Sequence, residues 1–290
     1  MKLLSYLRDE ILRHGYLIDE DHVVELGNGD LAELIAEQQS FANWRPPPTA
    51  DPIPLADVTV TAPLLRPGKV LAVAANYQEH VTEGGGTKLD KTRLVPRMFM
   101  KPTTAIAGPG DVIALPAESS QVDWEAELVV VLGRGGRNVS TEEALGLVAG
   151  YATGNDVSAR SVDYGFTRDT GAVGASAVWF FDWLAGKSFD AFAPYGPYLV
   201  TTDEVEDPQD LDVTLEVNGR RRQDGNTRDM IFTVAELIAF SSRLMTLEAG
   251  DVIFTGTPAG VGAATGEFLQ PGDEMVVRIG DLGTLINTVR

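Results

Sequence analysis

The sequence contains no cysteine and only three histidines, His14, His22 and His80. The absence of cysteine excludes disulfide bonds, thiolate metal sites and cysteine nucleophiles. A zinc site built from imidazoles would need all three histidines, two of which lie within the first 22 residues, and this disfavours zinc. Any bound metal is therefore expected to have carboxylate oxygen ligands, which suit Mg²⁺ or Mn²⁺ and also Ca²⁺.

Positive charge and long apolar runs are also scarce. The chain has 23 Lys and Arg residues against 42 Asp and Glu residues, a net charge of −19. Its one dense basic cluster, residues 220–222, follows an Asn-Gly pair typical of a hairpin tip, so we expect no nucleic acid partner. The apolar runs have only strand length, and charge precedes any seven-residue apolar stretch at the N-terminus. We therefore predict no signal peptide, no membrane span and a cytoplasmic protein.

Turn residues and apolar patterns divide the chain of 290 residues into two parts. Residues 1–62 predict a small N-terminal α/β domain with strands at 16–18 and 23–26 and a helix at 31–39. This domain ends in a stiff connector with five prolines in nine positions. Residues 63–290 predict a catalytic domain with helices at only 141–148 and 233–245. Its expected strands lie at residues 69–74, 112–115, 125–132, 150–155, 198–201, 212–217, 251–255, 274–279 and 283–289. Many strands with few helices favour a β-rich α+β fold, a mixed β-sandwich or roll.

Acidic residues stand where two of the expected strands begin or end. Glu125 and Glu127 are two positions apart on one strand, so their side chains point the same way. They either remain in water at a strand end or share a cation, because burying unpaired carboxylates is costly. Asp156 follows another expected strand, where it either caps a turn or supplies a third oxygen ligand.

His80 and Glu83 are three residues apart, which makes them neighbours on one helical turn. A carboxylate beside an imidazole stabilises its protonated form, which is the minimum chemistry for activating water. The alternative is an ordinary surface pair. Downstream, residues 250–262 form an expected strand followed by a glycine-rich loop, and the loop amides and the Thr257 hydroxyl either hold a carboxylate or simply form a structural turn.

The order of these motifs resembles that of the fumarylacetoacetate hydrolase family. The matching motifs are His-x-x-Glu, Asp-x-Glu-x-Glu, Asn-Asp-x-Ser-Ala-Arg, a Gly-Lys-Ser-Phe-Asp stretch and Thr-Gly-Thr-Pro-x-Gly-Val-Gly. The resemblance spans residues 66–290. It implies a β-rich roll that is usually dimeric, a carboxylate-bound Mg²⁺ or Mn²⁺, and a small N-terminal domain in the longer bacterial members.

The resemblance also implies a role for individual residues. The implied metal ligands are Glu125, Glu127 and Asp156, and the implied water-activating pair is His80 and Glu83. The implied contacts to the keto-acid end of a substrate are Arg160, Lys187, Gly256 and Thr257. Lys187 is also counted as catalytic, because it adds positive charge where negative charge develops.

One position departs from the family pattern. Family members usually carry a substrate-contacting Gln where this chain has Asp163. A carboxylate there should repel a second carboxylate on the substrate, which favours neutral or hydroxylated substrates. The alternative is a pair between Asp163 and Arg168 that never meets substrate. Residues 164–177, which include three glycines, are expected to close over bound substrate.

The leading hypothesis is a metal-dependent hydrolase that cleaves a C–C bond in 2,4-diketo acids (acylpyruvates), releasing pyruvate and a carboxylic acid. The presence of His80 and Glu83 favours hydrolysis, since this is the reaction that needs activated water. One alternative is an oxaloacetate or dienedioate decarboxylase, or a keto–enol isomerase, that uses the same metal-enolate centre. The other is a homologue that binds keto acids without turnover.

Overall fold

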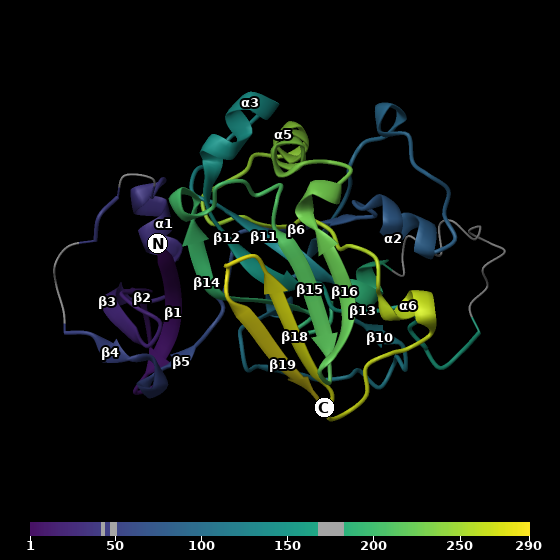
Figure 1. Ribbon diagram of the computed structural model, residues 1–290, viewed down its shortest axis with the longest axis horizontal. Helices are drawn as coiled ribbons and strands as arrows, with labels where there is room; N and C mark the ends of the chain where they lie inside the picture. Colours follow the sequence, from purple (N-terminus) through teal and green to yellow (C-terminus); the bar gives the residue numbers. More distant parts are fainter. Residues whose placement is uncertain (42–43, 47–50, 168–182) are drawn as a thin grey trace.

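The computed structural model describes residues 1–41, 44–46, 51–167 and 183–290, and it shows a β-rich fold with few helices (Figure 1). This confirms the predicted fold class. The order of the larger sheet is β4 (Ile53–Pro54), β3 (His22–Asn28), β2 (Ile11–Leu17), β1 (Lys2–Arg8), β14 (Ala193–Thr201), β12 (Val148–Asn155), β11 (Ala126–Leu132), β17 (Val252–Phe254), β6 (Val70–Ala74) and β7 (Arg97–Lys101). Two short strands join it at the side, β5 (Thr59–Val60) on β1 and β8 (Ile106–Ala107) on β14.

A second sheet packs against the first. Its order is β16 (Arg220–Asn226), β15 (Asp212–Val217), β18 (Glu274–Ile279), β19 (Thr284–Val289) and β9 (Val112–Ile113). A separate pair consists of β10 (Val122–Asp123) and β13 (Ser158–Ala159). The helices in the described residues include α1 (Ala32–Gln38), α2 (Gln78–Glu83), α3 (Thr141–Ala144), α5 (Val234–Leu244) and α6 (Gly262–Thr265), and residues 183–187 are also helical.

The strand β11 is buried on both faces, which explains the uninterrupted apolar run from Leu128 to Leu132. Leu128 and Val130 point into the core between the two sheets, where they join residues such as Leu215 of β15. Val129 and Val131 point into a second core on the opposite face, together with residues of α1. Glu127 lies at the beginning of this central strand, and Glu125 directly precedes the strand.

The helix predictions are confirmed with small changes of boundary. Ser140 caps α3 in a reciprocal capping box with Glu143, and the helix continues into a short 3₁₀ turn at Leu145–Leu147. Thr233 caps α5 in the same way with Glu236. In both places the Ser/Thr hydroxyl accepts a hydrogen bond from an otherwise unpaired amide of the first turn.

The N-terminal part contains a strand that the sequence reading missed. β1 was not predicted, and β2 begins at Ile11 instead of Tyr16. β1 has four consecutive buried residues because it lies between β2 and β14, and its side chains divide between two cores. Such a strand lacks the period-two alternation by which half-buried strands are recognised. Its antiparallel pairing with β14 extends the larger sheet, and the domain boundary at residue 62 stays a prediction.

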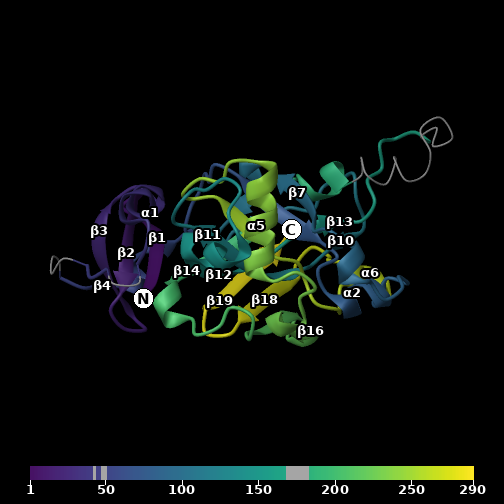
Figure 2. The ribbon, with the colours of Figure 1, turned by 90° about the horizontal axis from the view of Figure 1, so that it is seen from above.

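Figure 2 shows which elements lie at the two ends of the molecule. The N-terminal strands lie at one end, and α2 and α6 lie together toward the other. No helix among the described residues is long and apolar enough to cross a membrane.

Candidate active site

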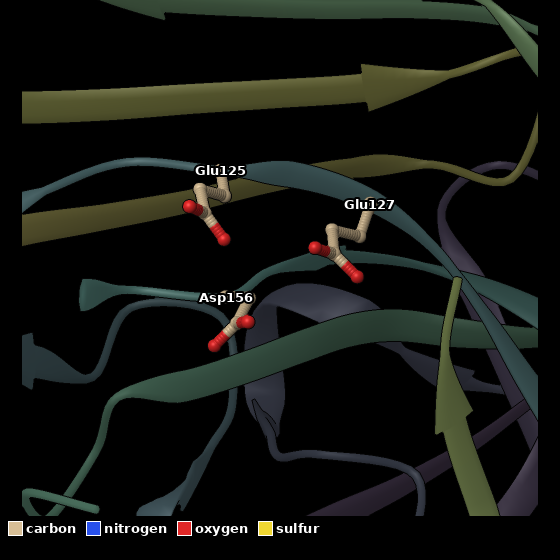
Figure 3. Close-up of side chains that lie close together, drawn as sticks. All are labelled: Glu125, Glu127 and Asp156. Carbon is tan, nitrogen blue, oxygen red and sulfur yellow. The ribbon is translucent and has the colours of Figure 1, made fainter. Parts of the chain in front are cut away.

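Three buried carboxylates meet where β11 begins and β12 ends. The two strands are antiparallel and pair Glu127 with Gly154, so the residues just outside the pairing, Glu125 and Asp156, are adjacent. The Asp156 amide donates a hydrogen bond of 2.8 Å to the backbone carbonyl of Glu125. One carboxylate oxygen from each of Glu125, Glu127 and Asp156 lies within 4.8 Å of the others (Figure 3). The structure therefore brings together the three residues that were predicted to share a cation.

The charges of these carboxylates are unequally compensated. Lys187 Nζ lies 2.6 Å from Glu125 Oε2 and 2.6 Å from Asp156 Oδ2. Burial would raise the pKa of Glu125, but Lys187 and the nearby Arg160 hold that pKa well below its usual range. Glu127 accepts a hydrogen bond of 2.7 Å from the Gly256 amide. Burial, with Asp156 and Glu125 nearby, raises the pKa of Glu127 well above its usual value.

This arrangement fits a divalent cation. The three donors are all oxygens, and the clustering of carboxylates penalises ionisation of Glu127, a penalty that a bound cation relieves. An all-oxygen donor set suits Mg²⁺, Mn²⁺ or Ca²⁺.

Lys101 on β7 is a further site residue, which the sequence reading did not single out. Its side chain is buried, and Nζ contacts Asp156 Oδ1 and donates a hydrogen bond of 2.6 Å to the Phe192 carbonyl. The stretch Phe-Met-Lys-Pro at residues 99–102 lies within the region of the family resemblance and includes this lysine. The available signal was a lysine directly after the three apolar residues 98–100, because buried ammonium groups need a partner.

His80 and Glu83 form the predicted pair on α2. His80 Nδ1 lies 2.8 Å from Glu83 Oε1, and the second oxygen of Glu83 accepts a hydrogen bond of 2.7 Å from the Gly260 amide. Since an ionised carboxylate only accepts, Nδ1 carries the proton and Nε2 is left as the basic nitrogen. The glycine-rich loop after β17 thus fixes the carboxylate that orients the imidazole.

Arg160 is bound to carboxylates of the protein. It lies 2.6 Å from Glu125 Oε1 and 2.8 Å from Asp123 Oδ2. Asp123 is fully buried and also accepts hydrogen bonds from the amides of Gly262 and Ala263 at the start of α6. Asp123 is the first acid of the Asp-x-Glu-x-Glu motif, and the sequence reading gave it no role.

The glycine-rich loop is engaged with the protein as well. The Gly256 amide donates to Glu127, so it is not free for a substrate carboxylate. Gly256 has φ +93°, and a Cβ at this position would lie 2.7 Å from Asn76 Cβ, which explains the glycine. Gln223 Nε2 donates a hydrogen bond of 2.8 Å to the Thr257 hydroxyl.

One cavity of about 230 Å³ contains this chemistry. Six of the predicted site residues line it, namely His80, Glu125, Glu127, Arg160, Lys187 and Thr257. The remaining wall of the described cavity is made by Val73, Ala74, Ala75, Arg97, Phe99, Ser158, Ala159, Trp183 and Gly186. An imidazole, two carboxylates of the cluster and several cations therefore face the same small volume.

Asp163 does not lie at this cavity. It is exposed, its carboxylate accepts a hydrogen bond of 2.8 Å from the Gly165 amide, and it borders a separate surface hollow with Phe189. The predicted substrate contact and its charge-based preference for neutral substrates thus lose their structural basis. The alternative partner, Arg168, and residues 168–177 of the predicted closing segment lie outside the described residues.

Comparison with known proteins gives the family. Residues 69–290 match the family model described as fumarylacetoacetate (FAA) hydrolase C-terminal. The 2,4-didehydro-3-deoxy-L-rhamnonate hydrolase of Sphingomonas sp. (strain SKA58) is 40% identical over 271 residues, which cover 92% of this chain and 89% of that protein. The mitochondrial oxaloacetate tautomerase FAHD2A of Homo sapiens is 42% identical over 239 residues, covering 82% of this chain and 71% of that protein.

A solved structure extends the similarity to the whole chain. Maleylpyruvate hydrolase from Sphingobium sp. SYK-6, in complex with manganese(II) and pyruvate, has a TM-score of 0.77 at 29% identity, with 100% of this chain and 98% of that chain covered. The family match extends over most of the sequence and includes every residue of the candidate site. The chain belongs to the fumarylacetoacetate hydrolase family.

Proposed function

We propose that the protein is a divalent-metal-dependent hydrolase of 2,4-diketo acids, which cleaves the C3–C4 bond to give pyruvate and a carboxylic acid. The observation that carries the proposal is that the His80–Glu83 pair and the Glu125–Glu127–Asp156 cluster belong to one small site. A water-activating base is needed for hydrolysis and not for an enolate centre alone. Two relatives support this reading, since the names of both describe hydrolases of acids with keto groups.

The metal ligands in this proposal are Glu125, Glu127 and Asp156. When bound, Mg²⁺ or Mn²⁺ would supply Lewis-acid polarisation of the keto-acid oxygens.

His80 is the general base of the proposed reaction. Its Nε2 accepts a proton from water, and the water oxygen attacks the C4 carbonyl of the substrate. Glu83 holds the ring through Nδ1, and Gly260 holds Glu83 in turn, so the base is oriented before substrate arrives. The same imidazolium can return its proton to C3 of the departing enolate.

Lys187 and Arg160 supply positive charge at the end of the cavity where the carboxylates lie. As the C3–C4 bond breaks, its electron pair moves onto the pyruvate enolate, and fixed cations lower the energy of that charge. Their contacts with Glu125 hold both side chains in place before the reaction.

The proposal is tested by a product assay with purified, metal-loaded protein. Acetylpyruvate, fumarylpyruvate and oxaloacetate are incubated separately, and the products are followed by NMR. Pyruvate and a carboxylic acid in equal amounts from an acylpyruvate support the hydrolase. If the NMR signals of a keto acid broaden and no product forms, the protein binds keto acids without turning them over, and the hydrolase proposal is contradicted.

A second candidate is keto–enol tautomerisation of oxaloacetate. The specific observation in its favour is the 42% identity to an oxaloacetate tautomerase. His80 would then move a proton at C3 of the substrate without activating water. In the assay above, enol–keto interconversion of oxaloacetate with intact acylpyruvates would favour this activity, and release of CO₂ would indicate decarboxylation. The homodimer and the cytoplasmic location stay predictions.

A further inference from the structure

We propose that Gln223 is a positioning residue for ligand binding, which acts through the hydroxyl of Thr257. By donating a hydrogen bond to this hydroxyl, Gln223 directs the hydroxyl proton into the cavity, toward an anionic oxygen of the ligand. Thr257 lines the cavity, whereas Gln223 lies behind it and is not among the described lining residues. The inference rests on the proposed function only in placing the keto-acid end of a substrate in this cavity.

Gln223 is a fully buried residue of β16, and its side chain links the two sheets. Its Oε1 accepts a hydrogen bond of 2.8 Å from the amide of Ala126 at the start of β11. Its Nε2 donates one hydrogen bond of 2.8 Å to the Thr257 hydroxyl and another of 2.9 Å to the carbonyl of Pro258. The side chain thus ties the beginning of β11 to the loop after β17.

The two backbone partners fix the orientation of this side-chain amide. The Ala126 amide can only donate a hydrogen bond, so the atom that faces it is the oxygen of Gln223. The Pro258 carbonyl can only accept, so the atom that faces both Pro258 and Thr257 is the nitrogen. Because an amide nitrogen donates and does not accept, the Thr257 hydroxyl is the acceptor in its contact with Gln223.

The proton of the Thr257 hydroxyl is therefore left for another acceptor. A hydroxyl has one proton to donate, and no acceptor for this proton is found in the part of the chain that the structure describes. Thr255 differs, since its hydroxyl donates a hydrogen bond of 2.8 Å to the Leu128 carbonyl. Thr257 lines the cavity and is only 3% exposed, so the acceptor that it meets when a ligand is bound is an oxygen of that ligand.

The surroundings of Thr257 favour an anionic oxygen as this acceptor. Lys187 and Arg160 line the same cavity and bring positive charge to it. A hydrogen bond to an ionised acceptor is stronger than one to a neutral acceptor, and a hydroxyl that already accepts from an amide is polarised into a better donor. The hydroxyl is also held in place before a ligand arrives, because Thr255 and Gly256 are bonded to β11.

The inference is tested by a double-mutant cycle in which calorimetry measures pyruvate binding at saturating Mn²⁺. Thr257→Val removes the hydroxyl and should weaken binding by about tenfold, because a hydrogen bond to a charged group is lost. Gln223→Met keeps the length of the side chain and should weaken binding by about three- to tenfold. In the Thr257→Val background the same change at Gln223 should alter binding by less than about twofold, since no hydroxyl remains to be directed. In the Thr257→Ser background, which keeps a hydroxyl, the loss should persist.

Gln209→Met is the matched control. Gln209 likewise bridges two backbone groups, because its Nε2 donates a hydrogen bond of 2.9 Å to the Thr227 carbonyl and its Oε1 accepts one of 2.6 Å from the Val234 amide. It lies away from the cavity, so its replacement should leave the affinity for pyruvate within about twofold of wild type. If Gln223→Met does not fold, Gln223→Glu takes its place in the cycle, because it keeps an acceptor for the Ala126 amide and presents an oxygen to Thr257.

The cycle distinguishes an effect through the hydroxyl from a purely structural one. An equal loss of pyruvate binding on changing Gln223 in wild type and in Thr257→Val overturns the inference, because Gln223 then acts through the loop backbone or through Ala126. An unchanged affinity in Gln223→Met overturns it as well. Coupling between the two positions without cleavage of any acylpyruvate contradicts only the proposed function, whereas cleavage without coupling contradicts only this inference.

Discussion

Glu127 offers the sharpest test of the metal site, because it is the carboxylate of the cluster that no cation pairs with among the described residues. Glu125 and Asp156 each contact Lys187, whereas Glu127 accepts a hydrogen bond from a backbone amide. The variant Glu127→Gln removes this charge and keeps an oxygen that can accept the same hydrogen bond. We expect opposite effects on the metal-free and the metal-loaded protein.

The metal-free protein should gain stability from Glu127→Gln. Oxygens of the cluster lie within 4.8 Å of one another, and two like charges at that distance repel by about 3 kcal/mol at an effective dielectric constant of about 20. Lys187 and Arg160 offset part of this repulsion, so we expect the free energy of unfolding at pH 7 to rise by about 1–3 kcal/mol. In wild type, a cation at about 100 times its Kd should add about 2.7 kcal/mol, or about 5–10 °C in Tm.

The pH dependence follows from the raised pKa of Glu127 in the folded state. In the unfolded chain the carboxyl of Glu127 has a pKa of about 4.3. In the folded protein the same carboxyl keeps its proton to higher pH. The folded state thus binds more protons in this interval, and metal-free wild type loses stability as the pH rises through it. Near pH 4 the unfolded carboxyl is mostly protonated as well, so most of the stability advantage of Glu127→Gln should be lost.

The assay is thermal and urea unfolding of chelator-treated wild type, Glu127→Gln and the control Glu274→Gln, with and without Mn²⁺. Glu274 is an exposed strand residue outside the site, so its variant should behave as wild type. If Mn²⁺ raises the Tm of Glu127→Gln as much as that of wild type, Glu127 is not a ligand. If Glu127→Gln is less stable than wild type without metal at pH 7, the repulsion argument is refuted.

Three further variants probe the surrounding residues. His80→Ala should lower acylpyruvate cleavage by about 10²–10⁴-fold and leave the Mn²⁺-induced rise in Tm intact; an unchanged cleavage rate would assign the base elsewhere. Lys101→Met should lower the free energy of unfolding by about 3–5 kcal/mol, measured in urea, because it leaves the buried Asp156 oxygen without its cation. Asp123→Asn should raise KM more than it lowers kcat, because Arg160 loses the carboxylate that holds it; an equal KM in steady-state kinetics would contradict this positioning role.

The parts of the site that sequence could predict are those encoded by spacing within one element. Because side chains alternate along a strand, Glu125 and Glu127 lie on one side of it. The helical repeat likewise places His80 next to Glu83. The family assignment is also confirmed, because the motifs occur in the expected order along most of the chain.

The parts that sequence could not predict depend on contacts between elements far apart in the chain. Lys101 reaches Asp156 only because β7 lies at the end of the sheet beyond β6, and Gly260 reaches Glu83 only because of the path of the loop after β17. Asp163 shows the converse: a residue matched to a family position by order along the chain lies outside the cavity. The order of residues along the chain therefore does not determine which side chains line the cavity.

The charges of the buried groups give a reason why these particular residues occur together. Four carboxylates, Asp123, Glu125, Glu127 and Asp156, are compensated by three cations, Lys101, Arg160 and Lys187. With all seven groups charged, one negative charge remains, and it resides on Glu127. A divalent cation would change the net charge of these groups from −1 to +1, and the carboxylate of one keto acid would neutralise that positive charge. Burial makes uncompensated charge costly, so the balance favours loading the cation first and a monoanionic keto-acid group second.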